Sequence, residues 1–531
     1  MSFATVHSCT LSGVHALPVT VEVHIAGGLP GMSIVGLPES AVRESKDRVK
    51  AAIQHIGLTF PQVKIIVNLA PADLPKRGGR FDLPIALGIL LANGELPDGS
   101  LDNLMVVGEL GLTGQLRSVS GILPTSFAFS DTSYALYIPA ENADEALRST
   151  RTCVHSVDNL KQAVDELRKR KTIPLLRNVS PSSPVFESSN DRVLNVSVPV
   201  NSVLSAAEPM GCKAPDMSEV FGQHMARRAL EIAAAGGHNM LMVGPPGTGK
   251  SMLASRLSTI QPTMEEVEAM ETASVLSISH TGFDHALWGV RPFRAPHHTA
   301  SGVALVGGGA HPMPGEISLA HNGVLFLDEL PEFSRTVLDV LREPMETGTI
   351  TVSRAARQAK FPSRFQLVAA MNPCPCGYYT DPKTNCRCGA DQILRYQSRV
   401  SGPFLDRIDL HLSLQREATP LGDVTVDGGN ESSDIIRLRV EKARQTQIKR
   451  QGVNNAVLTG TALFKHANLA AAVRKTIKSA SESMNLSLRS QHRLIRVART
   501  IADLEGRDNV TLDDVAEGLM YRSVPVLNGA S

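Results

Sequence analysis

A glycine-rich stretch at residues 244–251 carries the clearest chemistry in this chain. An apolar run at 240–243 precedes it and a helix-compatible run at 252–257 follows it, which is the context that a phosphate-binding loop requires. Backbone N–H groups of such a loop bind phosphate oxygens, a lysine contacts the β- and γ-phosphates, and a hydroxyl holds Mg²⁺. We therefore expect ATP and Mg²⁺ to bind at Gly244, Pro245, Pro246, Gly247, Thr248, Gly249, Lys250, Ser251 and Met252.

Two carboxylates and an amide follow at the ends of later apolar runs. Residues 324–327 lead into Asp328 and Glu329, as in a buried parallel strand that delivers acids to one edge of a sheet. We expect Asp328 to join the Mg²⁺ shell and Glu329 to orient and deprotonate the attacking water. A further apolar run at 365–370 precedes Asn372, which is expected to position that water. Solvated strand ends and an Asn-Pro turn are the plain alternatives.

These groups require an α/β core with parallel strands to bring them together. A chain of 531 residues predicts three or four domains. Strand-like and helix-like runs alternate over residues 1–175 and again over 207–418. Residues 176–206, rich in serine with scattered prolines, predict a linker, and residues 430–531 are helical in pattern. The predicted fold class is a multidomain α/β protein with a helical carboxyl-terminal part.

Several segments besides the phosphate loop resemble the YifB/ComM family of magnesium-chelatase-like AAA+ proteins. The resemblance spans almost the whole chain and is carried by residues 233–239, 294–298, 323–330, 371–377 and 401–409. It implies a Lon-protease-like domain at 1–175, an AAA+ core with pore insertions at 207–418, and a helical lid of the magnesium-chelatase type at 430–531. ComM-type members act as hexameric DNA helicases that promote branch migration in natural transformation, so the resemblance also implies DNA and a homo-hexamer as partners.

The resemblance assigns further site residues. Arg407 matches the arginine finger, which enters the neighbouring subunit's site and stabilises charge on the transferring phosphoryl group. An ordinary ion pair with Asp406 or Asp409 is the alternative for it. Arg489 matches the sensor-2 residue that contacts the γ-phosphate in cis, and Asn372 matches sensor 1. Phe221 and Gln223 match the turn that flanks the adenine, whereas the arginines after Arg489 are predicted to form a solvated face: Arg493, Arg496 and Arg499.

Four cysteines lie within fifteen residues directly after Asn372: Cys374, Cys376, Cys386 and Cys388. Four thiolates are the number that a closed tetrahedral zinc site takes, although the C-x-C spacing is tighter than the usual C-x-x-C. We favour a structural zinc ion that cross-links the two ends of the intervening loop. Free thiols are the alternative.

Local positive charge gathers between residues 347 and 380, which contain four basic side chains and no acidic one. Residues 350–364 predict two strands around a turn, and Arg354, Arg357 and Lys360 are the expected DNA contacts. In a hexameric ring six copies of this hairpin would lie near the central pore. A solvated hairpin is the alternative.

A loop-rich segment at 291–316 precedes the acidic strand and resembles the family's helix-2 insertion. It contains His297 and His298, but the nearest further metal ligands, His311 and Glu316, lie beyond three successive glycines. We therefore favour a structural or DNA-proximal role for the two histidines.

The segment that resembles the nucleophile region of Lon proteases is residues 76–87. It contains no serine, and Leu123 stands where the resemblance places the catalytic lysine, so the Ser/Lys dyad is missing. Without the dyad, this domain could serve as a scaffold, form an oligomer ring or bind nucleic acid. The basic residues Lys76, Arg77 and Arg80 weakly favour nucleic-acid binding.

Composition limits the remaining function classes. Fifty-three basic against 52 acidic residues give a net charge of +1, so no global positive field attracts nucleic acid or lipid. The longest apolar run, 83–92, is too short to span a bilayer, and residues 1–28 lack a secretory pattern, so we expect a cytoplasmic protein.

The expected function is an ATP-dependent DNA helicase. The alternatives are a magnesium-chelatase-like or chaperone-type ATPase that remodels a protein partner, a Lon-type protease, and a nucleotide-binding scaffold.

Overall fold

The computed structural model describes residues 2–149, 152–169, 215–309, 312–354, 357–379, 381–416, 430–484 and 486–522, and the backbone of two short strands at 176–178 and 194–196. The side chains of Arg354 and Arg357 lie outside this set. Two compact units make up the chain. The first comprises Met1–Ala207 and Ala273–Trp288, and the second comprises Glu208–Thr272 and Gly289–Ser531. The predicted linker at 176–206 lies outside the described residues except for the two short strands.

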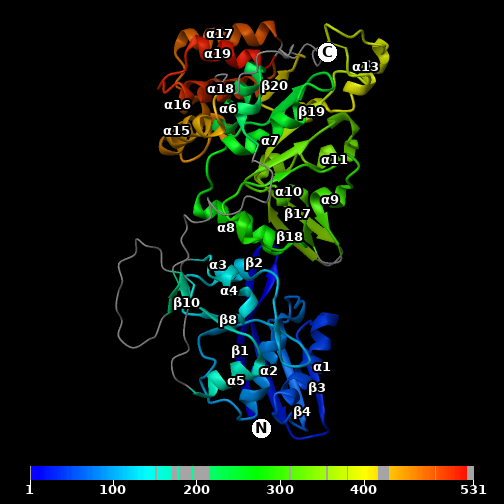
Figure 1. Ribbon diagram of the computed structural model, residues 1–531, viewed down its shortest axis with the longest axis vertical. Coiled ribbons are helices and arrows are strands. Elements are labelled where there is room, and N and C mark those ends of the chain that lie inside the picture. Colours follow the sequence, from blue (N-terminus) through cyan, green and yellow to red (C-terminus); the bar gives the residue numbers. More distant parts are fainter. Residues whose placement is uncertain are drawn as a thin grey trace. The chain divides into compact units, whose positions relative to one another are not determined.

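The first unit is built around one mixed sheet. Among the described residues nine strands join in the order β11-β10-β9-β8-β5-β1-β2-β4-β3 (Figure 1). β1 (Ser2–Ser12) and β2 (His15–Ala26) form a long antiparallel hairpin, in which alternate residues of β2 are buried because they face the core. The other strands are β3 (Gly31–Val35), β4 (Lys64–Ala70), β5 (Leu104–Val106), β8 (Ala135–Pro139), β9 (Val154–Val157), β10 (Leu176–Asn178) and β11 (Leu194–Val196), and a separate pair is formed by β6 (Glu109–Leu110) and β7 (Leu116–Arg117).

Helices of the first unit pack on this sheet through apolar faces. α2 (Asp82–Ala92) is apolar on all sides and almost entirely buried, because it contacts both β1 and β2. α5 (Leu160–Lys169) is amphipathic instead, with its buried residues at a spacing of three and four. The remaining helices are α1 (Ser40–His55), α3 (Ile122–Ala128) and α4 (Ala143–Ala146).

The second unit contains a five-stranded sheet in the order β13-β16-β19-β12-β20, in which every neighbouring pair is parallel. Its strands are β12 (Met240–Val243), β13 (Phe293–Arg294), β16 (Val324–Leu327), β19 (Gln366–Met371) and β20 (Leu410–Ser413). Because the strands are parallel, the residues that follow them share one edge of the sheet and the residues that precede them share the other.

Four helices share one hydrophobic core with this sheet: α6 (His224–Gly236), α7 (Lys250–Ile260), α15 (Ser433–Gln451) and α18 (Leu488–Leu504). A basic hairpin is formed by β17 (Thr349–Arg354) and β18 (Arg357–Pro362), and a shorter one by β14 (Gly307–Gly308) and β15 (Met313–Pro314). Further helices are α9 (Gly302–Val306), α10 (Glu316–Leu319), α11 (Arg335–Val340), α12 (Pro344–Thr347), α13 (Ala390–Gln397), α14 (Gly402–Leu405), α16 (Gly460–Ala467), α17 (Ala471–Ser483) and α19 (Leu512–Met520), and α8 (Glu266–Ser277) contains residues of both units.

Arginines on α18 are not a solvated face, so that prediction is wrong. Arg499 is fully buried and pairs with Asp503 one helical turn later, at 2.7 Å. Arg493 pairs with the buried Asp409 at 2.8 Å. Ion pairs with the buried carboxylates of Asp409 and Asp503 offset the cost of removing these arginine side chains from water.

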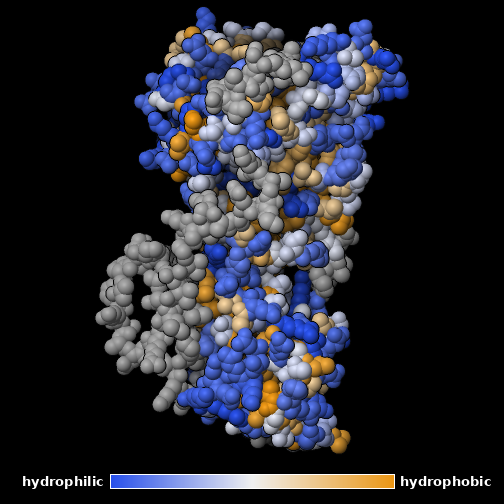
Figure 2. Space-filling model, viewed as in Figure 1, coloured by the Kyte–Doolittle hydropathy of each residue, from blue (hydrophilic) through white to orange (hydrophobic). Residues whose placement is uncertain are grey.

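The expected α/β fold with parallel strands is confirmed for the second unit. Among the described residues, no helix combines the length and the apolar content that crossing a bilayer demands. On the face drawn in Figure 2, hydrophobic residues lie in small separate groups among hydrophilic ones.

Candidate functional site

The phosphate loop and the residues that follow β16 and β19 line one cavity of about 340 Å³. α7 begins at Lys250, so the positive end of its dipole lies at this cavity. Gly247 and Gly249 have φ values of +79° and +83°, which side-chain-bearing residues rarely adopt. The lining residues are Pro246, Gly247, Thr248, Gly249, Lys250, Ser251, Met252, Asp328, Glu329, Met371 and Asn372, of which only Met371 is absent from the sequence-based set.

Lys250 is buried and donates to the loop itself. Its Nζ lies 2.7 Å from the carbonyl oxygen of Gly244 and 2.9 Å from that of Pro245. A third contact, 3.1 Å long, reaches Oδ1 of Asn372. Burial lowers the pKa of Lys250, which the charge of Asp328 partly offsets. A phosphate arriving in the cavity meets an ammonium group whose present partners are neutral oxygens, so the charge of the lysine is available to it.

Ser251 and Asp328 are arranged as a magnesium site would require. The Ser251 hydroxyl donates to Oδ2 of Asp328 at 2.6 Å. A hydroxyl and a carboxylate are oxygen ligands of the kind that Mg²⁺ prefers, so Ser251 and Asp328 would hold the ion, which would neutralise phosphate charge. The two residues therefore fit a Mg²⁺ ion bound together with a nucleotide.

Glu329 lines the same cavity from a constrained backbone position. Its φ is +52°, in the left-handed region, and its N–H donates to Oδ1 of Asp328 at 2.9 Å. Its carboxylate lies 3.0 Å from Nδ1 of His298, which comes from the segment after β13. Sequence reasoning gave His298 a structural or DNA-proximal role and missed this contact. Nothing local in the sequence signals it, since the pair is joined only by the adjacency of β13 and β16.

The residues expected to flank adenine do not line this cavity. Phe221 is half exposed, and Gln223 donates to the carbonyl of Gln415 at 2.9 Å. Gln415 precedes Arg416, whose guanidinium donates to the carbonyl of Pro246 at 3.0 Å. Gln223 is thus linked to the phosphate loop by way of the chain after β20.

Arg407 and Arg489 line a second cavity, of about 900 Å³, and not the phosphate-loop cavity. Residues that directly precede β12, β16, β19 and β20 also line it, so it lies at the opposite edge of the sheet from the phosphate loop. Arginine dominates its charged lining: among the described residues Arg291, Arg364, Arg407, Arg444, Arg489, Arg493 and Arg496, against the acids Glu268, Glu346 and Asp409. A cavity of this charge suits a phosphate-bearing ligand or surface.

Arg407 pairs with neither aspartate that the sequence offered. Its Nη2 lies 2.6 Å from Oε1 of Glu346 in α12, and its Nη1 donates to the carbonyl of Pro403 at 2.6 Å. Glu346 is more than half exposed, so solvent reaches the pair from the glutamate side. A partner anion can compete with Glu346 for this arginine.

The basic hairpin folds in the predicted place. β17 and β18 pair in register from Thr349 opposite Pro362 to Arg354 opposite Arg357. Ile350 and Phe361 are buried on one face of the hairpin, and Lys360 is exposed on the other. The backbone thus places Arg354 and Arg357 at the tip of the hairpin.

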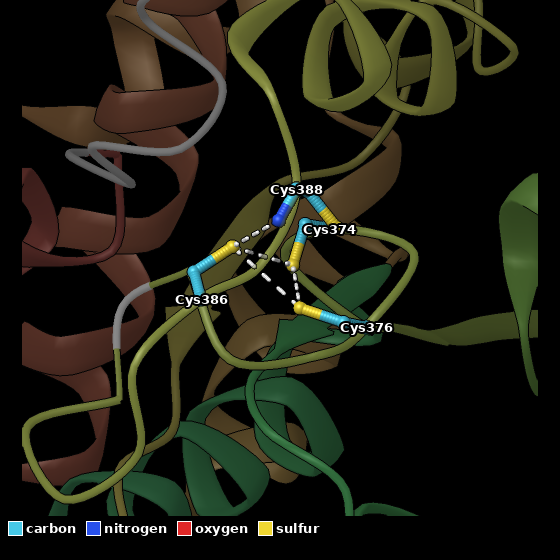
Figure 3. A group of neighbouring side chains, drawn as sticks. All are labelled: Cys374, Cys376, Cys386 and Cys388. Atoms are coloured by element: carbon cyan, nitrogen blue, oxygen red, sulfur yellow. Dashed lines mark hydrogen bonds between the residues drawn. The ribbon is translucent and has the colours of Figure 1, made fainter.

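Figure 3 shows the four cysteines converging from the two ends of one loop. Their sulfur atoms lie within 4.8 Å of one another, with separations of 3.3 Å for Cys374–Cys376 and 3.5 Å for Cys376–Cys386. Zinc–sulfur bonds of about 2.3 Å place tetrahedral sulfurs roughly 3.8 Å apart, so the four residues fit a zinc ion. The N–H of Arg387 lowers the pKa of Cys376 to about 6, which favours the thiolate that a metal binds, whereas burial raises the pKa of Cys374.

In the first unit, the two segments that resemble the Lon dyad regions lie in contact. Arg80 donates to Oγ1 of Thr125, two residues after Leu123, at 3.3 Å. Lys76 is fully buried and Arg80 nearly so, which means that these two residues do not form a nucleic-acid surface. Burial lowers the pKa of Lys76.

Comparisons with known proteins identify the family of the chain. Three models match in chain order: subunit ChlI of Mg-chelatase at residues 21–142, magnesium chelatase subunit ChlI at 216–420, and its C-terminal part at 430–522. Competence protein ComM of Haemophilus influenzae is 45% identical over 525 residues, which cover 99% of this chain and 98% of the relative. The uncharacterized proteins YifB of Escherichia coli and Salmonella typhimurium are 44% and 43% identical, each over 99% of this chain and 98% of their own. The chain therefore belongs to the YifB/ComM family of magnesium-chelatase-like proteins.

Proposed function

We propose that the protein is an AAA+ ATPase that hydrolyses ATP with Mg²⁺. The observation that carries this proposal is the single cavity in which the phosphate loop, Ser251 with Asp328, Glu329 and Asn372 come together. Lys250 and the amino end of α7 would neutralise the phosphates, and Ser251 and Asp328 would hold the metal ion, which supplies further charge neutralisation at the transferring group. Glu329 would take the proton of the attacking water, and Asn372 would orient that water.

The working unit is a ring of identical subunits, six in the family's known members. In one chain Arg407 and Arg489 lie at the opposite edge of the sheet from the phosphate loop. Strands of about four residues separate the two edges by roughly 13 Å. Arg407 would therefore serve the nucleotide of a neighbouring subunit, and the position of Arg489 beside the same cavity favours a trans role for it as well, in place of the cis contact that the family resemblance implies.

DNA is the proposed substrate, and branch migration during natural transformation the proposed process. The basic hairpin with Lys360 on its exposed face supports the first part, and the likeness to a competence protein supports the second. Six hairpins around a pore would bind phosphates along a strand without reading sequence. Zinc at Cys374, Cys376, Cys386 and Cys388 is proposed as a structural cofactor.

The ATPase rate of the full chain with and without single-stranded, duplex and branched DNA tests the proposal. We expect stimulation by DNA, greatest with the branched form. Glu329→Gln should keep nucleotide binding and lower turnover by at least about 100-fold, because a general base contributes that much. Glu332→Gln, the same change three residues later, is the matched control. A motor stimulated by a protein partner and indifferent to every DNA would refute the substrate assignment.

Charge removal tests the hairpin separately. Replacing its three basic residues by alanine should weaken DNA binding and flatten its salt dependence by about 0.9 in the log–log slope for each phosphate that the hairpin no longer neutralises. Nucleotide affinity should not change. Three exposed lysines on the carboxyl-terminal helices provide a control of equal charge. Unchanged DNA affinity in the first variant would remove the hairpin from the DNA site. The test set is Arg354, Arg357 and Lys360, and the control set is Lys465, Lys475 and Lys478.

A further inference from the structure

The cysteine loop touches the phosphate loop directly. Gly377, one residue after Cys376, has a φ of +86°, and a Cβ added there would lie 2.6 Å from Cδ of Pro246. The pyrrolidine ring cannot rotate away, so the glycine is what allows the two backbones to approach. The same Cβ would lie 3.8 Å from Asn372. Residues on two sides of the nucleotide cavity thus pack against one glycine of the cysteine loop.

A second connection runs through Arg416. Its Nη2 donates to the carbonyl of Pro246 at 3.0 Å, and its guanidinium lies over the ring of Tyr378 at 5.3 Å. Its Nη1 lies 3.4 Å from the carboxylate of Asp381, whose side chain is fully buried. Tyr378 and Asp381 belong to the cysteine loop, so this loop fixes the arginine that holds the Pro246 carbonyl.

Regular secondary structure does not hold the cysteine loop in this shape. No helix or strand occurs among the described residues between β19 and α13, the interval that contains all four cysteines. A segment without regular structure keeps one conformation only when cross-links or side-chain contacts fix it. The four sulfur atoms lie close enough for one metal ion to supply that cross-link.

We propose that metal at the four cysteines sets the shape of the phosphate loop and thereby the affinity for nucleotide. Gly377 and Arg416 are the positioning residues that transmit this effect to Pro246. The inference rests on the proposed function, because it concerns the same nucleotide cavity. It goes further in making nucleotide affinity depend on a metal ion that touches no part of the nucleotide.

The experiment measures binding of a fluorescent ADP analogue to the full chain, with zinc content determined in parallel. Zinc-loaded protein should bind the analogue, removal of zinc by a chelator should weaken binding about tenfold, and restored zinc should reverse the loss. Equal affinity with and without zinc would overturn the proposal, as would protein that contains no zinc when purified without chelators. A zinc-loaded protein that binds no nucleotide would instead refute the proposed ATPase.

Two variants keep the test independent of whether the metal-free loop stays folded. Arg416→Gln and Gly377→Ala should retain zinc and still weaken binding of the ADP analogue severalfold, because the first removes the guanidinium hydrogen bond to the Pro246 carbonyl and the second adds a Cβ that clashes with the Pro246 ring. Arg395→Gln removes the same charge from an exposed side chain of α13, outside the cysteine loop, and it should change neither zinc content nor affinity. Wild-type affinity in Arg416→Gln and Gly377→Ala would show that the cysteine loop does not position the phosphate loop.

Discussion

Asp409 links the start of β20 to the carboxyl-terminal helices, and its replacement offers the sharpest test of the second unit's packing. The carboxylate is 3% exposed and pairs with Arg493 of α18 at 2.8 Å. Its other oxygen accepts the N–H of Asn239 at 3.2 Å and lies 3.5 Å from Nδ1 of His238. Asp409→Asn keeps the shape but replaces one acceptor by a donor that faces another donor. It also leaves the Arg493 charge without its partner.

The expected cost is about 3 kcal/mol of unfolding free energy. Breaking a buried pair by removing one partner costs about 3 to 5 kcal/mol. The lower end applies because the Arg493 side chain retains 15% exposure and so some solvation. Asp406→Asn, a change of the same kind on a half-buried carboxylate three residues earlier, should cost less than about 1 kcal/mol.

Urea unfolding followed by circular dichroism measures this difference, with Asp406→Asn as the matched control. A loss below about 1 kcal/mol at pH 7 would refute the reasoning, because the pair would then contribute no more than a surface ion pair.

The pH dependence of this difference has a definite sign. Burial alone raises the pKa of Asp409, but the hydrogen bond and charge of His238, with the charges of Arg493 and Arg496, outweigh burial and hold the pKa well below its usual range. A carboxyl with a depressed folded pKa stabilises the fold above its unfolded pKa of about 3.9, and this stabilisation is lost as pH falls from there toward the folded pKa. The difference between wild type and Asp409→Asn should be constant from neutral pH to about pH 5 and shrink below about pH 4.

Two predictions concern the ATPase directly. Arg407→Ala should abolish hydrolysis, yet mixing it with Lys250→Ala protein should restore some activity, because intact fingers then reach intact phosphate loops; a mixture as inactive as its components would contradict action in trans. His298→Ala should lower kcat about tenfold with unchanged ATP affinity, since Glu329 loses the partner that orients its carboxylate, and His298→Asn should recover part of the rate. His297→Ala, at the adjacent ring, is the control, and an increase in DNA-independent turnover for His298→Ala would contradict the orienting role.

Short parallel strands were the easiest elements to predict. The apolar runs at 240–243 and 324–327 coincide with β12 and β16, and the run at 365–370 differs from β19 by one residue. Central strands of a parallel sheet are buried on both faces, so they appear in the sequence as uninterrupted apolar runs bounded by turn residues. The positions of the nucleotide-cavity residues follow from those runs, because the phosphate loop, the Asp328–Glu329 pair and Asn372 each begin directly after a strand.

Contacts that depend on tertiary packing could not be predicted from the sequence. The only local pattern that accompanies the burial of Arg499 is an aspartate four residues later, with which it pairs. Solvent-exposed helices have the same i, i+4 pairs of opposite charge, so the pattern does not predict burial. Arg407 pairs with Glu346, sixty-one positions away and on another element, and no period or motif connects the two. Such pairs depend on which loop ends meet at the sheet edge, and that is decided by the whole fold.

One buried sheet joins the two ends of the proposed reaction. β12, β16, β19 and β20 each have the phosphate-loop edge at their carboxyl end and the arginine-lined cavity at their amino end. β12, β16 and β19 are short and fully buried. Because protein interiors are close-packed, we expect these strands to move together as one rigid body. In the proposed ring, a nucleotide that shifted the phosphate loop of one subunit would therefore also shift the edge that holds Arg407, which is the edge that would meet the next subunit's nucleotide. Glu346 lies at the same edge, directly before the basic hairpin. If Arg407 exchanged Glu346 for a phosphate, the segment before the hairpin would lose this ion pair, and we expect the hairpin to shift at the same step.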